Sequence, residues 1–139
     1  MVNREIIIQR LTVIKKYLKY LKKLKLVSFE EFELDEEFQI IIERSLQIIG
    51  QSILDLGNHI IAENEWDKPQ SYKDIITILK TKKVINTKYS DVLAGLISLR
   101  NILVHDYVSV DVDIIYHETI DQIHVIEYFI DQIEKLYIL

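Results

Sequence analysis

The chain has no cysteine, one proline and three glycines among its 139 residues. Without cysteine it cannot form disulfides, thiolate zinc sites or cysteine nucleophiles, and we expect a reducing, cytoplasmic environment. So few glycines and prolines do not supply the turns of an all-β or loop-rich fold. Neither the first residues nor the longest apolar run, residues 92–97, could serve as a signal peptide or span a bilayer. We therefore expect one all-α domain over residues 1–139, without membrane insertion.

The net charge of −5 argues against binding of nucleic acid through a strong overall positive field. The charge is unevenly distributed along the chain. Residues 1–27 contain eight basic side chains and one acid, Glu5, so this segment carries +7 and the remainder must carry −12. Such a lysine-rich helix face is commonly a solvated face, but it also leaves room for contact with phosphates or with an acidic partner surface.

Apolar residues recur at helical spacing through most of the chain, and they predict an antiparallel bundle of four long helices and one short helix. In the first segment Ile7, Leu11, Ile14, Leu18 and Leu21 form one stripe. Ser28 and Glu31 have capping-box spacing, and Asp35, Ser71 and either Asp111 or Asp113 are placed to begin later helices. The predicted helices cover residues 3–26, about 36–64, 72–81, from Asp91 to about 105, and from about 112 almost to the terminus.

The second predicted helix carries two stripes. Its core face is predicted to hold Phe38, Ile41, Ile42, Ile48, Ile49 and Leu56. A polar stripe of Arg44, Gln47, Gln51, Asp55 and Asn58 follows at spacings of three and four residues. The simpler interpretation of this stripe is a solvated face. The alternative is a polar groove in which uncharged amides accompany Arg44 and Asp55.

A cluster of reactive residues lies at the end of the fourth predicted helix. Arg100 and Tyr107 are seven residues apart and would lie nearly above one another, whereas His105 would lie roughly 140° around the helix from Arg100. For Arg100 and His105 to face one reacting group, the helix must end or distort near His105, or two chains must build the site together. Taken alone, an Arg, a His and a Tyr near the C-terminus of a helix are more often capping and packing residues than catalysts.

The other histidines do not form a recognisable metal site. His124 and Glu127 match one half of a di-iron pattern, but a second such pair is absent, and His59 and His117 are explained by packing or solvation. There is no glycine-rich phosphate loop. We therefore expect neither a metal nor another cofactor.

The segment 100–107, Arg-Asn-Ile-Leu-Val-His-Asp-Tyr, resembles the signature of the HEPN superfamily, in which four to six residues, the first of them polar, separate an Arg from a His. The His-x-Tyr ending is similar to the HepT-like toxin branch, whose members are partners of minimal nucleotidyltransferase (MNT) antitoxins. Residues 43–47, 55–61 and 69–72 also resemble upstream segments of that branch in type and order. The resemblance covers roughly residues 5–137.

This resemblance implies a metal-independent endoribonuclease toxin that acts as a homodimer, with two signatures meeting across a cleft. It implies that His105 is the acid/base and that Arg100 holds the phosphate, roles that suit an imidazole and a guanidinium near neutral pH. Asn101, one helical turn before His105, could orient the imidazole or bind substrate. Tyr107 is implied to accept AMP from the MNT antitoxin, which would block RNA binding.

Arg44, Gln51 and Asp55 are the residues that we expect to support this site or to contact RNA. Two other classes of function remain compatible with the sequence. One is a HEPN bundle that binds nucleotides or assembles with a partner without cutting RNA. The other is a purely structural helical bundle, in which Arg100, His105 and Tyr107 could be replaced by alanine without functional effect.

Overall fold

The computed structural model describes residues 2–105 and 110–139, and the regular secondary structure of these residues is all helical. In chain order the elements are α1 (Arg4–Lys23), the 3₁₀ turn η1 (Leu24–Leu26), α2 (Phe29–Glu33), α3 (Glu36–Glu63), α4 (Tyr72–Thr81), α5 (Thr87–His105) and α6 (Val112–Tyr137). The prediction of an all-α fold with four long helices and the short helix α4 is confirmed. α2 is the brief turn expected after the capping box.

Polar side chains cap the helices at most of the predicted positions. The Ser28 hydroxyl accepts the N–H of Glu31 at 3.1 Å, and the Glu31 carboxylate accepts the N–H of Ser28 at 3.2 Å, which completes the capping box. Ser71 caps α4 by accepting the N–H of Asp74. At α6 the cap is Asp111 rather than Asp113, because Asp111 accepts the N–H of Asp113 at 2.8 Å.

The start of α5 differs from the prediction. The sequence favoured a start at Asp91, but α5 begins at Thr87 because the Asn86 side chain accepts the N–H of Tyr89 at 3.0 Å. The additional turn is fixed by contacts with α6: the Tyr128 hydroxyl accepts the N–H of Asn86 at 2.9 Å, and the rings of Tyr89 and Tyr128 lie 4.3 Å apart. These tertiary contacts favour Asn86 rather than Asp91 as the residue that caps the start of α5.

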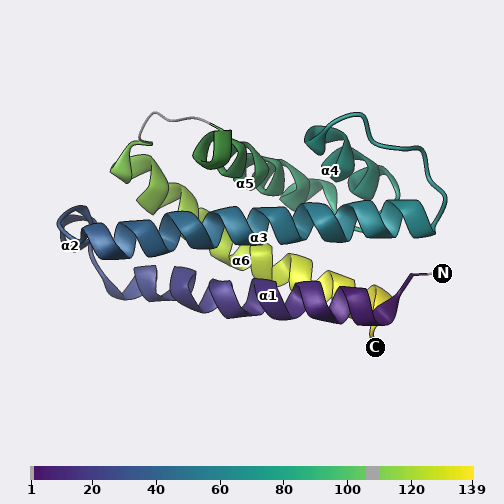
Figure 1. Ribbon diagram of the computed structural model, residues 1–139, viewed down its shortest axis with the longest axis horizontal. Helices are drawn as coiled ribbons and strands as arrows, with labels where there is room; N and C mark the ends of the chain where they lie inside the picture. The colour runs from purple at the N-terminus through teal and green to yellow at the C-terminus, as the bar shows by residue number, and fades with distance from the viewer. Residues whose placement is uncertain (1, 106–109) are drawn as a thin grey trace.

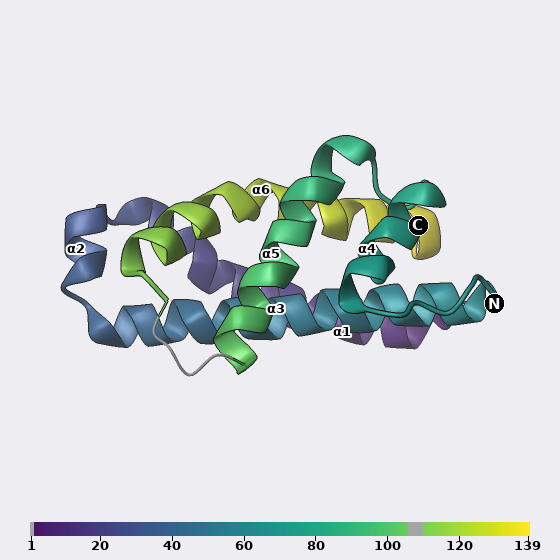
Figure 2. The same ribbon diagram turned by 90° about the horizontal axis from the view of Figure 1, so that it is seen from above.

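α1 and α3 run side by side in opposite directions, and α6 packs along α1 (Figure 1). α5 crosses α3 at a steep angle, with α4 beside it over the C-terminal half of α3 (Figure 2). Part of the basic charge of α1 is matched by acids of α6, since Lys15 pairs with Glu134 and Lys22 with Glu127 at 3.0 and 3.1 Å. Some of the basic side chains of residues 1–27 therefore form ion pairs within the protein, which leaves fewer of them free to bind a partner.

The core forms where these helices meet. The α1 stripe from Ile7 to Leu21 is buried as predicted. On α3, Ile42, Ile49 and Leu56 are fully buried, whereas Ile41 is 41% exposed and the prediction for it is wrong. α3 packs against α1, α4 and α5, so its buried face is broader than one stripe and turns away from Ile41. Within the described residues, no helix combines the length and apolar character that crossing a bilayer requires.

Candidate active site

Arg100 of α5 is held against α3 at a glycine. A Cβ atom on Gly50 would lie 2.7 Å from Cγ and 2.9 Å from Cβ of Arg100, so any larger residue at position 50 would displace the arginine. This close approach leaves Arg100 only 7% exposed, which is unusual for a charged side chain. The crossing of α3 and α5 therefore determines where the guanidinium lies.

Neutral groups surround the Arg100 guanidinium. One terminal nitrogen donates a hydrogen bond to Asn101 Oδ1 at 2.8 Å, the other donates to Gln51 Oε1, and the Tyr72 ring centroid lies 5.4 Å from Cζ. The buried Nε has no partner within the described part of the chain. Among the residues that the structure describes, no carboxylate forms an ion pair with Arg100. A buried positive charge surrounded by amides is suited to binding an anion from solvent.

The polar stripe of α3 lines a groove beside Arg100 with a volume of about 440 Å³. Gln51, which binds Arg100 through its oxygen, donates from Nε2 to Asp55 Oδ1 at 2.8 Å. Asp55 in turn lies 3.5 Å from a terminal nitrogen of Arg10 on α1. A chain of polar contacts thus runs from α1 through α3 to Arg100.

Arg44 and Gln47 line the other part of the groove. Arg44 donates to Gln47 Oε1 at 3.1 Å, and Gln47 Nε2 donates to the carbonyl of Leu103 at 3.3 Å. The structure therefore brings together Arg100, Asn101, Gln51 and Asp55 through hydrogen bonds, with Arg44 on the same groove. This geometry matches the polar-groove interpretation of the stripe. Its last member, Asn58, lies at a neighbouring cavity instead.

His105 is the last residue of α5, so the helix reaches the signature histidine, and its side chain lies outside the described residues. Tyr107 also lies outside them. On α3, Glu43 lies one helical turn before Gln47, and partial burial raises the pKa of its carboxyl above the ordinary value.

The histidines outside the signature have structural contacts. His59 Nε2 accepts the backbone N–H of Asn3 at 3.0 Å, His117 pairs with Asp113, and the ring of His124 packs against Tyr89. The described ranges contain no group of three or more His, Cys, Asp or Glu side chains positioned to hold a metal ion.

Sequence analysis did not identify Arg10, Tyr72 or Gly50 as part of the site. Arg10 was one of eight basic residues in its segment, and nothing local distinguishes it. Gly50 carried a usable signal, because glycine inside a helix costs about 1 kcal/mol relative to alanine and usually has a packing reason. Tyr72 lay in a segment that resembled the HepT-like branch, but without an implied role.

Three comparisons identify relatives of the chain. The mRNA nuclease HepT of Shewanella oneidensis is 32% identical over 130 residues, which cover 94% of this chain and 97% of that protein. The tRNA nuclease HepT of Aphanizomenon flos-aquae is 29% identical over 106 residues, 76% of this chain and 72% of the relative. The solved structure of the tri-AMPylated Shewanella oneidensis HEPN toxin in complex with MNT antitoxin superposes with a TM-score of 0.84, at 32% identity, covering 94% of this chain and 97% of that one.

The family-level match agrees with these relatives. The model of the ribonuclease HepT-like family matches residues 14–133, a range that includes α3, α5 and the groove residues that these two helices contribute, whereas Arg10 and Val13 of α1 precede it. The chain therefore belongs to the ribonuclease HepT-like family.

Proposed function

We propose that this protein is the toxin of a toxin–antitoxin pair and acts as a metal-independent endoribonuclease. The observation that carries the proposal is the buried Arg100 guanidinium, which is bonded to the amides of Gln51 and Asn101, lies on a polar groove and precedes His105 by five residues. RNA is present in the cytoplasm, and a chain without cysteine is suited to that reducing compartment.

These residues suit cleavage of an RNA phosphodiester. In the proposed reaction the ribose 2′-oxygen attacks the adjacent phosphorus, and its proton passes to the neutral imidazole of His105. The bond between phosphorus and the 5′-oxygen breaks, and that oxygen takes a proton from the imidazolium of His105, which leaves a cyclic phosphate and a 5′-hydroxyl and restores the neutral imidazole. Arg100 binds the phosphate oxygens and stabilises the negative charge that grows on them. Asn101 and Gln51 keep the guanidinium in place, so none of these steps needs a metal ion.

We propose two assembly partners for the protein. We infer a homodimer, because Ile102 and Val104 within the signature are 43% and 42% exposed, and Val104 lies at the edge of the groove. Covering these side chains with a second copy would also place the two signatures close to each other.

We further infer that an MNT-type nucleotidyltransferase neutralises the toxin by modifying Tyr107, since a toxin in the superposed complex is AMPylated and bound to MNT antitoxin.

Cleavage of RNA by purified protein tests the proposed function. Wild type should cleave single-stranded RNA in the presence of a chelator, and both Arg100→Ala and His105→Ala should lose this activity while keeping their helix content in circular dichroism. Arg4→Ala, which removes an exposed arginine at the start of α1, is the matched control and should cleave normally. Undiminished cleavage by His105→Ala would contradict the acid/base role.

Growth of cells expressing the gene tests the toxin assignment. Expression should arrest growth, and co-expression of a neighbouring nucleotidyltransferase gene should restore it. Arrest by Arg100→Ala at the wild-type level would instead indicate a module that binds without cutting RNA.

A further inference from the structure

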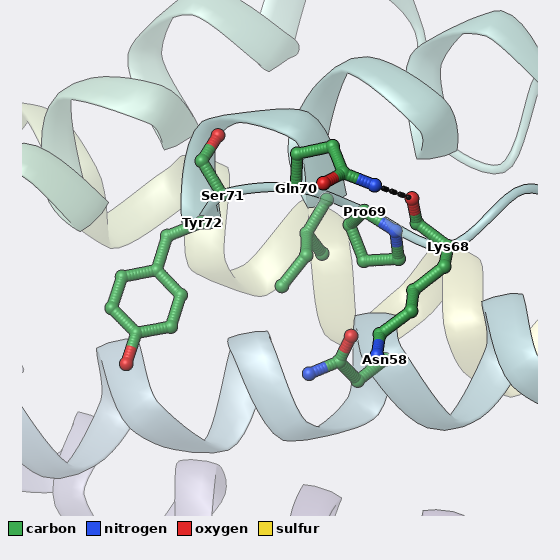
Figure 3. Close-up of a pocket in the computed structure, with 7 residues that line it drawn as sticks. Asn58, Lys68, Pro69, Gln70, Ser71 and Tyr72 are labelled. Carbon is green, nitrogen blue, oxygen red and sulfur yellow. Dashed lines mark hydrogen bonds between the residues drawn. The ribbon is translucent and has the colours of Figure 1, made fainter.

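A second cavity, of about 450 Å³, is lined in part by Tyr72 (Figure 3). The ring of the same tyrosine lies beside the Arg100 guanidinium. Residues 68–72, which lead into α4, form one wall, and Asn58 of α3 forms the floor. Tyr72 lies on one side and Lys68 on the other, with Asn58 between them. We call this cavity the base pocket, defined by Asn58, Lys68, Pro69, Gln70, Tyr72 and Ile75.

The polar groups of the base pocket are available to a ligand. The side-chain amide of Asn58 and the ammonium of Lys68 have no hydrogen bond or ion pair with any residue that the structure describes. Gln70 donates from Nε2 to the carbonyl of Lys68 at 3.3 Å, which leaves its Oε1 free to accept. None of the lining residues is acidic. The pocket thus offers two amides and one positive charge, without a carboxylate that would repel a phosphate.

Part of the lining of the base pocket is apolar. The Tyr72 side chain is 43% exposed, and Pro69 and Ile75 complete the apolar lining. Single-stranded RNA is recognised in this way, with a base stacked on an aromatic ring and its edge hydrogen-bonded by side-chain amides. An asparagine amide, with one donor and one acceptor side, can pair with such an edge.

The base pocket neighbours the polar groove beside Arg100. Asn58 follows Asp55 on the same stripe of α3 and lies about 4.5 Å further along the helix axis. Tyr72 connects the two regions, since its ring centroid lies 5.4 Å from Arg100 Cζ and the same residue lines the pocket. A nucleotide next to the phosphate that Arg100 binds therefore has its base within reach of this pocket.

We propose that the base pocket binds one nucleobase of the RNA substrate and thereby contributes to the choice of cleavage site. The base stacks on Tyr72, Asn58 and Gln70 bond its edge, and Lys68 faces a phosphate of the same nucleotide. This inference rests on the proposed ribonuclease function, because it takes Arg100 as the neighbouring phosphate-binding residue.

Nucleotide titration tests the pocket without any cleavage. ¹⁵N-labelled His105→Ala protein would be titrated with 5′-AMP, 5′-GMP, 5′-CMP and 5′-UMP, and the Asn58 side-chain amide signals would be assigned by their loss in Asn58→Ala. At least one nucleotide should shift these signals, and Asn58→Ala should weaken its affinity about threefold to tenfold, the effect of one hydrogen bond. If no nucleotide shifts the Asn58 signals, the proposal is overturned.

Cleavage of a mixed-sequence RNA gives the second measurement. Asn58→Ala and Lys68→Ala should raise KM more than they lower kcat and should change the nucleotide frequencies beside the cut. Lys25→Ala removes an exposed lysine from η1, at the opposite end of the molecule, and is the control. It should leave the kinetic constants and the nucleotide frequencies beside the cut unchanged. If both pocket variants cleave RNA as wild type does, with the same KM and the same cut sites, the base-pocket proposal is overturned and the ribonuclease function stands. Shifted Asn58 signals without wild-type cleavage would overturn the ribonuclease function and support a nucleotide site.

Discussion

Gly50 of α3 contacts Arg100 of α5, and the position of the Arg100 side chain depends on the absence of a side chain at Gly50. The methyl group of Gly50→Ala would lie 2.7 Å from Arg100 Cγ, so the arginine must move away from Gln51. We expect most of the RNA cleavage to be lost and the free energy of unfolding to fall by about 1–3 kcal/mol from overpacking. Activity assays and thermal melts on the same preparations measure both effects.

Gly95→Ala is the matched control on α5. A Cβ atom at position 95 would have its nearest neighbour, Gln122 Nε2, at 3.7 Å, which is an ordinary contact. This variant should keep its activity and melt at the same or a slightly higher temperature, because alanine favours the helix by up to about 1 kcal/mol. Equal behaviour of the two alanine variants would show that the space at Gly50 is not required.

Tyr107 is the position at which we expect regulation. Tyr107→Phe removes the acceptor oxygen but keeps the ring, so it should prevent modification by the antitoxin and spare most of the RNase activity. Attached AMP would bring a negative charge into the same signature as Arg100 and should weaken RNA binding. Intact-mass measurement after co-expression tests this role: added adenylyl mass on Tyr107→Phe, or none on wild type, would place the modification elsewhere.

At the scale of helices, the beginning of α5 shows a tertiary contact overriding a local signal. Asn86→Ala should destabilise the protein by about 1 kcal/mol through loss of the helix cap. Asp91→Ala should have little effect, because Asp91 lies inside α5 and is exposed. Chemical denaturation of both variants provides the comparison, and a larger loss from Asp91→Ala would mean that the helix starts where its sequence alone predicted.

Much of the helical architecture follows from periodicity, since Ile7, Leu11 and Ile14 can be buried together on only one helix face. The sequence could not place Ile41, because the same spacing fits a core face that is rotated slightly around α3. Nor could it predict that Gln51 would connect Asp55 to Arg100, or that Arg10 would join them. The contacts of Gln51 with Arg100 and of Arg10 with Asp55 link residues from separate helices, and the helix crossings that create them have no local signal.

At the scale of the whole molecule, we expect two copies to assemble through the signature ends of α5. Light scattering at micromolar concentration should give twice the mass of one chain. Ile102→Asp should shift the protein toward the monomer, because a charge would then have to be buried at the interface. Ile8→Asp, on the exposed face of α1, is the control. A wild-type monomer would contradict the dimer.

The buried Arg100 also implies a conflict between stability and activity. A guanidinium that is 7% exposed, with an unsatisfied Nε and no carboxylate partner among the described residues, costs folding free energy until an anion occupies the site. Arg100→Met, which keeps the volume and removes the charge, should therefore melt at a higher temperature than wild type while losing RNA cleavage. A lower melting temperature would show that the amides and Tyr72 already compensate the charge. RNA and inorganic phosphate should raise the melting temperature of wild type, because each binds only the folded protein, and should raise that of Arg100→Met less.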